Sequence, residues 1–455
     1  MQPVAQDEFE ISSSSSPSDP EYLQKQAGAT ELSFSDRQQH DSNRLLTSTM
    51  IKGHQRDGDA SAWLQCLAAF FLMLNSFGLI NSYGTFQAFY EVEILRSESA
   101  SNLSWIGSLQ TFLSLFGGIA AGPLFDRGYL RSLTCVGGFL VVLGMMLTSV
   151  CYSYWQFVLT QGLLVGLGCA CLFTPGMAIV PQYFTKNRNL ALGLATSGAS
   201  LGGILYPIMF NQLLQRGVGF GWSCRILAFV ILGTMMFAVA IVRWRGKQGT
   251  AAAKPSGALG AWKEPAYVMF TVCSFFGFMG IYVPFYYIQL YSFELQYVDP
   301  SLLGYIVSFL SLGSLFGRLI PPYLADMYDA LTVAVIVILG LAVTGLCWIA
   351  VTSQAAIIAF CILFGFFSGA FLALGPAVVA YITTDMSTFG ARVGMLLVPA
   401  SIGTLIGNPI AGAVLTKNWL ALQLFCGIVL IMSWMMALGS KGYLTWTKRH
   451  HSESL

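Results

Sequence analysis

Of the 455 residues, 23 are Lys or Arg and 21 are Asp or Glu, so about 10% are charged, against roughly 25% in soluble domains. Hydrophobic residues make up 55% of the chain, more than a soluble interior of this size could bury, which excludes an ordinary soluble fold and indicates a lipid environment. The net charge of +2 is too small for a surface that follows nucleic-acid phosphates, so we expect no nucleic-acid partner.

Residues 1–56 differ in composition from the rest of the chain. They are rich in Ser, notably Ser12 to Ser16, and contain no long apolar run. We interpret them as a disordered cytosolic tail. They lack the basic region followed by an apolar region that a secretory signal needs, so the first apolar segment, which begins near Trp63, is expected to remain in the membrane.

From Trp63 onward the sequence contains twelve apolar stretches of about 20 residues, a length that spans roughly 30 Å of hydrocarbon at 1.5 Å per residue. The third and fourth stretches depend on a very short turn at residues 153–155. The sequence therefore predicts an all-α membrane protein with twelve transmembrane helices. The predicted helices are 63–86, 103–125, 132–152, 156–181, 189–212, 224–243, 266–290, 302–325, 331–352, 355–381, 391–415 and 420–440.

Basic residues gather in alternate connections between these helices. The polar, Gly-rich and Pro-rich segment 244–265 predicts a cytosolic linker between an N-terminal six-helix bundle at 57–243 and a C-terminal six-helix bundle at 266–440, followed by a cytosolic tail at 441–455. Because Lys and Arg favour the cytosolic side, we expect both termini to be cytosolic in a multi-pass protein of the cell membrane. The basic connections carry Arg127, Arg131, Lys186, Arg188, Arg243, Arg245, Lys247, Lys254, Lys263 and Arg392.

The second half of the chain repeats the first at an offset of 200 residues. The run Ser-Leu-Phe-Gly at 114–117 recurs at 314–317, and Asp126 recurs as Asp326. A duplicated six-helix unit in one orientation gives parallel repeats about an axis normal to the membrane. The sequence therefore predicts two parallel six-helix repeats with a cavity between them.

The segment GPLFDRGYLR at 122–131 follows the second predicted helix. It resembles the signature between helices 2 and 3 of the major facilitator superfamily, which implies the major facilitator fold. Asp126 can cap the next helix or meet a basic group, so with Arg127 and Arg131 it would form a latch that breaks when the halves move. Asp326 would be a weaker latch in the second half because no Arg follows it. A simple turn between two helices is the alternative.

Three further places resemble the monocarboxylate porter family. The segment DGDASAW at 57–63 resembles the start of that family's first helix, and NSYGTFQ at 81–87 is similar to its fungal members. The segment YFTKNRNLALG at 183–193 resembles the connection between helices 4 and 5, and Gly317, Arg318 and Pro321 resemble helix 8. The resemblance implies a secondary transporter that moves small organic anions by alternating access.

Arg318 is the exception among ionisable groups that otherwise lie at predicted helix ends. It stands 16 residues after Leu302 and eight before Asp326. A charge at that depth costs roughly 2.5 to 3.5 kcal/mol on insertion scales, so Arg318 should face the bundle interior. The family resemblance implies that it binds a substrate carboxylate, which suits a guanidinium. An Arg paired with helix-end carbonyls or with a neighbouring helix is the structural alternative.

The other candidate substrate contacts are uncharged. Asn81, which corresponds to a Lys of animal members of the family, and Gln87 offer hydrogen bonds without fixed charge. The seventh predicted helix adds an aromatic wall that includes Tyr282, Phe285 and Tyr286. Ordinary packing against lipid or helices accounts for these aromatic residues equally well.

The inventory of reactive groups argues against other classes of function. All four His lie in the tails, no Asp lies at mid-membrane depth, and no P-loop sequence occurs, so we expect no enzyme, no metal and no cofactor. Ser314 replaces the acidic residue that the family associates with proton coupling, so we expect only weak dependence on a proton gradient.

The prediction is a secondary active transporter for a small organic anion or metabolite, whether monocarboxylate-like, vitamin-like or a secondary metabolite. Its expected partners are membrane lipid and this substrate, and a monomer would suffice. A non-transporting sensor of the same fold is the alternative.

Overall fold

The computed structural model describes residues 59–184, 188–244, 259–383, 388–416 and 418–453. The expected disordered tail at 1–56 and most of the expected linker at 244–265 lie outside the described residues. The chain divides into two units, Met1–Asp59 and Ala60–Leu455, and the described helices all belong to the second.

Twelve helical spans in the described residues are long and apolar enough to cross a membrane, which confirms the predicted number. No strand occurs in these residues, because a chain in lipid must satisfy its backbone hydrogen bonds within each segment. The first six spans are α2 (Ala60–Asn75), α3 (Phe77–Asn81), α4 (Tyr83–Phe89) and the π-helical η1 (Tyr90–Ile94); α5 (Ala100–Phe116) and α6 (Gly118–Asp126); α7 (Leu130–Thr148); α8 (Tyr154–Phe157), η2 (Val158–Val165), α9 (Gly166–Ala178) and η3 (Val180–Gln182); α10 (Arg188–Gln215); and α11 (Phe220–Ile241).

The second set of spans follows the segment 245–258 and continues beyond the predicted end at residue 440. Its last helix runs on to Glu453, so residues 441–453 extend a membrane helix. The six spans are α13 (Pro265–Glu294); α15 (Ile306–Gly317) and α16 (Ile320–Met327); α17 (Ala330–Cys347) and η5 (Trp348–Ala350); α18 (Gln354–Ile382); α19 (Phe389–Leu415); and α20 (Trp419–Glu453), with the short helices η4 (Leu259–Lys263) and α14 (Pro300–Leu303) beside them.

The internal repeat is visible in where the helices begin and break. Ser153 precedes α8 and Ser353 precedes α18, exactly 200 residues apart in sequence, and each makes a hydrogen bond that caps its helix. The second span is interrupted at Gly117, and its counterpart, the eighth, is interrupted at Arg318 and Leu319. The connection between the third and fourth spans is short but lies at 149–153, earlier than the predicted turn at 153–155, since α7 ends at Thr148 and α8 begins at Tyr154.

The two halves meet through two pairs of helices that the repeat exchanges. In one pair α5 of the first half packs along α19 of the second, and in the other α15 of the second half packs along α10 of the first. Helices α5 and α19 belong to spans 2 and 11, and helices α15 and α10 belong to spans 8 and 5. Because span 2 corresponds to span 8 and span 5 to span 11 in the repeat, exchanging the halves maps one pair onto the other. The arrangement is that of two parallel six-helix repeats, as predicted.

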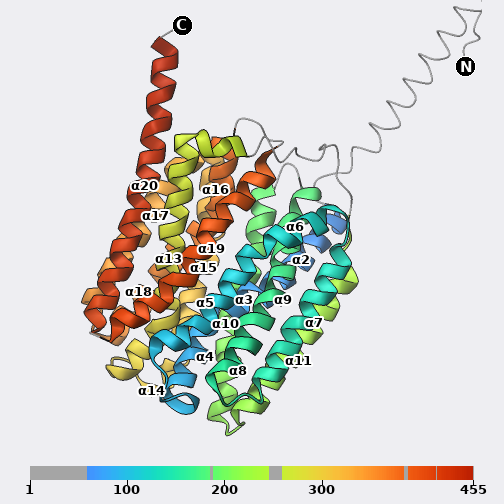
Figure 1. Ribbon diagram of the computed structural model, residues 1–455, viewed down its shortest axis with the longest axis vertical. Coiled ribbons are helices and arrows are strands. Elements are labelled where there is room, and N and C mark those ends of the chain that lie inside the picture. Colours follow the sequence, from blue (N-terminus) through green and yellow to red (C-terminus); the bar gives the residue numbers. More distant parts are fainter. Residues whose placement is uncertain (1–58, 185–187, 245–258, 384–387, 417, 454–455) are drawn as a thin grey trace, which may run out of the picture. The chain divides into compact units, whose positions relative to one another are not determined.

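The two ends of the bundle are distinguished by the connections that they carry. The end with Asp126, Val242, Glu264 and Asp326 is named the linker end here, because the segment 245–258 joins the halves there. The opposite end, which carries α14 and the connection after η1, is named the far end. Figure 1 shows α6 and α16 at the linker end and α8 and α14 at the far end.

A buried ion pair holds two helices of the second half together at the linker end. Arg392, near the start of α19, is 4% exposed and donates to both carboxylate oxygens of Glu264 at 2.7 and 2.6 Å. Its guanidinium also donates to Thr388, and Tyr267 donates to its backbone carbonyl at 2.7 Å. The sequence placed Arg392 only on a basic connection, whereas the structure uses it to join α13 to α19.

We predict that Arg392→Ala destabilises the protein by about 2 kcal/mol, because it leaves Glu264 without its partner in a partly buried position. Arg96→Ala is the matched control, since Arg96 and Glu93 form an ion pair with side chains that are 69% and 52% exposed. Such an exposed pair contributes about 0–1 kcal/mol. Thermal unfolding of the two purified variants measures the difference, and equal midpoints would contradict the structural role of Arg392.

Candidate functional site

A cavity of about 520 Å³ lies between the two halves at the linker end. Its size falls within the range of pockets that bind small organic molecules. Apart from Thr196 and Asp326, its lining residues have apolar side chains or are Gly. The first half contributes Met177, Leu192, Gly193 and Thr196, and the second contributes Pro322, Ala325, Asp326, Ala330, Ala373, Pro376, Ala377, Ala380 and Phe389.

At the far end the two halves are in contact and hydrogen-bonded. Ser101 of α5 donates to the carbonyl of Pro409 in α19 at 2.8 Å, and Asn408 donates to Ser108 at 3.2 Å. In the symmetric pair of helices, Ser308 of α15 donates to the carbonyl of Ile204 in α10 at 3.2 Å. The structure is therefore a state that is open at the linker end and closed at the far end.

The backbone of Arg318 adjoins the cavity wall, although its side chain does not line the cavity. Its wall neighbours are Pro322, one turn later in the chain, and Gly193, whose added Cβ would lie 3.0 Å from the Arg318 carbonyl. Arg318 is 4% exposed, its Nε donates weakly to Ser314 Oγ at 3.4 Å, and its Nη2 has no hydrogen-bond partner. No ion pair with a carboxylate is formed by this guanidinium in the part of the chain described.

Asn81 and Tyr282 approach the same region from two other helices. Asn81 donates through Nδ2 to the carbonyl of Ala199 at 3.3 Å, while its Oδ1 is buried without a partner. Tyr282 of α13 is close enough to Arg318 for electrostatic interaction, and its buried hydroxyl has no hydrogen-bond partner. The structure thus brings two of the predicted residues near Arg318 or near the helix that carries it.

Phe285 and Tyr286 lie in the closed contact between the halves and do not line the cavity. The Tyr286 ring centroid is 4.9 Å from that of Tyr83, and its hydroxyl is 3.2 Å from that of Thr111. The carbonyl of Phe285 occupies the space that a Cβ on Gly84 would need. These aromatic residues pack one half against the other in this state, in keeping with the packing alternative considered for them.

Gln87 lies almost two turns from Asn81 toward the far end, beside Tyr287. Its side chain is buried and neither amide atom has a hydrogen-bond partner. One turn further, Glu91 has one carboxylate oxygen buried without a partner and experiences the charge of Glu294 across the contact between halves. Glu91, which is partly buried, was not singled out from the sequence.

The predicted gating residues Asp126, Arg127, Arg131 and Asp326 are all exposed at the linker end. Asp326 lines the cavity, which places it at the opening between the halves. Gly128 has a φ of +90°, so the turn of this segment needs a residue without Cβ, and that explains the Gly of the motif. Backbone geometry therefore explains why Gly128 occurs in this turn, but it does not explain why Asp126 does.

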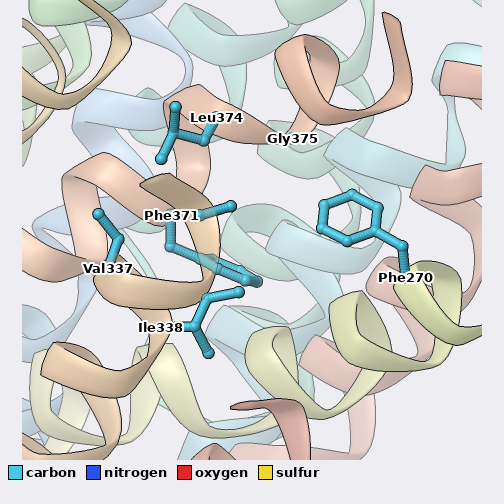
Figure 2. Close-up of a pocket in the computed structure, with 7 residues that line it drawn as sticks. Phe270, Val337, Ile338, Phe371, Leu374 and Gly375 are labelled. Atoms are coloured by element: carbon cyan, nitrogen blue, oxygen red, sulfur yellow. The ribbon is translucent and has the colours of Figure 1, made fainter. Parts of the chain in front are cut away.

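A second space, inside the second half, is too small for a ligand. It measures about 10 Å³ and lies between α13, α17 and α18. Figure 2 shows Phe270 on one side of it and Phe371, Val337 and Ile338 on the other. A space of this size and lining is a dry packing gap.

Twelve spans in two related halves, with a central cavity open at one end and closed at the other, define a membrane carrier of the alternating-access class. The comparisons agree with the geometry. The chain belongs to the Major Facilitator Superfamily, whose family model matches residues 65–369.

Two relatives come from the fungus Emericella nidulans. The transporter dbaD, described as of the major-facilitator type, is 38% identical over 83% of this chain and 85% of its own. The aspyridones efflux protein apdF is 36% identical over 85% of this chain and 78% of its own. Among solved structures, the nucleoside transporter NupG has a TM-score of 0.63 and 11% identity, covering 84% of this chain and 99% of its own, which supports the fold alone.

We predict that Gly84→Val prevents closure of the far end, because its side chain would collide with the backbone of Phe285, which cannot move aside as a side chain could. The state open at the linker end should then be depleted. With Thr196→Cys as a reporter in the cavity wall, alkylation from the linker end should slow at least fivefold.

Gly122→Val is the matched control, since nothing lies within 4 Å of a Cβ at that position. The exposed residues Cys135 and Cys347 are first replaced so that only the reporter reacts. Unchanged labelling in a folded Gly84→Val protein would show that the halves do not approach as described.

Proposed function

We propose that the protein exports an acidic, largely apolar small metabolite by alternating access, as a member of the monocarboxylate porter-like branch of its superfamily. The observation that carries this proposal is Arg318, a buried cation without a carboxylate partner among the described residues, whose backbone adjoins a cavity lined mostly by apolar side chains. An anion that enters the cavity would supply the missing charge, and the walls would accept the rest of the molecule.

The energetics of Arg318 favour a ligand over a structural role. A guanidinium in the membrane interior is costly unless it is paired, and its one hydrogen bond, to Ser314, is long at 3.4 Å. Arg392 provides the comparison within the same chain, because it is equally buried but makes two short hydrogen bonds to Glu264. The alternative of an Arg paired with carbonyls or a neighbouring helix finds no support in the hydrogen bonds of Arg318.

Export is proposed from the relatives. The apdF protein is named for the efflux of aspyridones, and a protein of Gibberella fujikuroi that is 34% identical over 87% of this chain is named for the efflux of fujikurins. The substrate of this chain is therefore proposed to be a secondary metabolite. The two relatives are named for different metabolites, so they do not identify which one.

The charge pattern supports a cytosolic linker end and a protein of the cell membrane. On that orientation the cavity is open to the cytosol, where an exporter loads its substrate. Asp126, Arg127, Arg131 and Asp326 are proposed to act as a latch between the states, since all four are exposed at the linker end.

The test of function begins with cells that lack the protein and cells that regain it, whose media are compared for metabolites. We predict that one or a few acidic compounds disappear from the medium of the deficient cells. Arg318→Lys, which keeps the charge but loses the planar fork, should lower their export about tenfold, and Arg318→Ala about a hundredfold.

Surface amounts and thermal unfolding of both variants serve as controls. A folded Arg318→Ala protein with normal export would overturn the proposal, and an Arg318→Ala protein that misfolds while Arg318→Lys stays normal would indicate a structural residue. Identical media with and without the protein would favour the sensor over the transporter.

For orientation, we predict that a protease site inserted at Pro255 is cleaved only from the cytosolic side. The matched control is the same site at Val218, in the far-end connection between α10 and α11, which should be cleaved only from outside. The reverse pattern would invert the proposed orientation.

A further inference from the structure

Two buried serines lack the hydroxyl hydrogen bond that most buried serines in the described helices make. A buried Ser in a helix normally donates its hydroxyl to the carbonyl four residues earlier. Ser76, Ser114 and Ser274 do so here, at 2.8, 2.7 and 3.2 Å. Ser200 of α10 and Ser311 of α15 are fully buried, and neither hydroxyl has a hydrogen-bond partner.

Both serines lie just beyond the linker-end cavity, on the helices that join the halves. On α10, Thr196 lines the cavity and Ser200 follows one turn deeper. A Cβ on Gly203, the next position on that face, would meet Ser311 Oγ and would lie 3.0 Å from the Cβ of Asn81. The two halves therefore place Ser311 and Asn81 against Gly203, and Ser200 lies three residues before Gly203 on α10.

Arg318 reaches toward the same region. Its Nε contacts Ser314, so the side chain runs back along α15. Ser311 lies three residues before Ser314, a rise of about 5 Å along the helix. The Nε of Arg318 and the unpaired hydroxyl of Ser311 are thus held about one helical turn apart along α15, and the unpaired hydroxyl of Tyr282 lies near the guanidinium.

Leaving so many polar atoms without partners is costly. Each buried, unsatisfied donor or acceptor costs about 1–3 kcal/mol, and lipid supplies no partner. A carrier that must bind and release its cargo has a reason to bear this cost, because the empty site keeps the groups that the cargo will satisfy. Ser200 and Ser311 offer donors, whereas Asn81 Oδ1 offers an acceptor.

We propose that Ser200 and Ser311, with Asn81, form a second recognition point that hydrogen-bonds an oxygen of the substrate. The inference rests on the proposed function, since Arg318 would hold the acidic group. The substrate class is then an acid with a hydroxyl or carbonyl oxygen about 5–7 Å from its charge. A hydroxyl fits best, because it can accept from a Ser and donate to Asn81.

The probes are benzoate, 4-hydroxybenzoate and 2-hydroxybenzoate, which share a ring and a charge and differ only in the hydroxyl. Their affinities are measured with the full-length protein in lipid nanodiscs. We expect 4-hydroxybenzoate to bind about tenfold more tightly than benzoate, and 2-hydroxybenzoate, whose oxygen is too close to the carboxylate, to show no such gain.

Ser311→Ala should remove most of the tenfold preference and change the affinity for benzoate less than twofold, and Ser200→Ala should weaken the preference in part. Ser274→Ala is the matched control, because that hydroxyl is already satisfied within its own helix. It should keep the full preference. Equal thermal unfolding of the three variants shows that a lost preference is not a lost fold.

Several results would overturn the inference. The first two are equal affinity for the three acids and no binding of any of them. The third is a preference for 4-hydroxybenzoate that survives the double substitution of Ser311 and Ser200 by Ala, which would mean that these hydroxyls do not contact the ligand. None of these results decides the proposed function, which depends on export and on Arg318. Normal export by a folded Arg318→Ala protein would refute the proposed function, whatever the binding results for the serine variants.

Discussion

The close approach of two backbones at glycine is the constraint on which this state depends. At Gly84 the carbonyl of Phe285 fills the space of a side chain, and at Gly203 the hydroxyl of Ser311 does the same. A Cβ at Gly84 would hold the halves apart because the Phe285 backbone cannot move aside, whereas at Gly203 the nearest group is a side chain. Because the halves meet so closely toward the far end, they diverge toward the linker end, and the cavity there is a consequence of this contact.

The spans could be predicted from sequence because each depends on its own composition. The twelve apolar stretches and the short connection before Tyr154 were legible in residues that lie close together in the chain, and the repeat was legible from a comparison of the two halves. The contact between halves depends instead on which face of one helix meets which face of another. The sequence could therefore name Arg318 and Tyr282 but had no reason to choose Ser200 or Ser311, although Thr196, Ser200 and Gly203 do recur at helical spacing.

Arg318 and Arg392 show why composition does not assign a role to a buried charge. Both are 4% exposed, both lie on helices of the second half, and both follow a hydroxyl residue by four positions. They differ in the group that lies opposite the guanidinium. Glu264 satisfies Arg392, which therefore contributes to stability, whereas no carboxylate of the described residues satisfies Arg318. Depth in the membrane predicts that such a residue has a partner, but only the fold distinguishes a permanent partner from a transient one.

The hydrogen bonds that close the far end share one property with a wider consequence. Ser101 and Ser308 donate to carbonyls, Asn408 donates to a hydroxyl, and none of these groups carries a charge. Dissolved salt screens only charges, over about 8–10 Å at physiological ionic strength. The hydrogen bonds that close the far end are therefore insensitive to ionic strength, whereas charged groups such as Asp326 at the linker end, or Glu91 and Glu294 at the far end, respond to the salt of the compartment that they face.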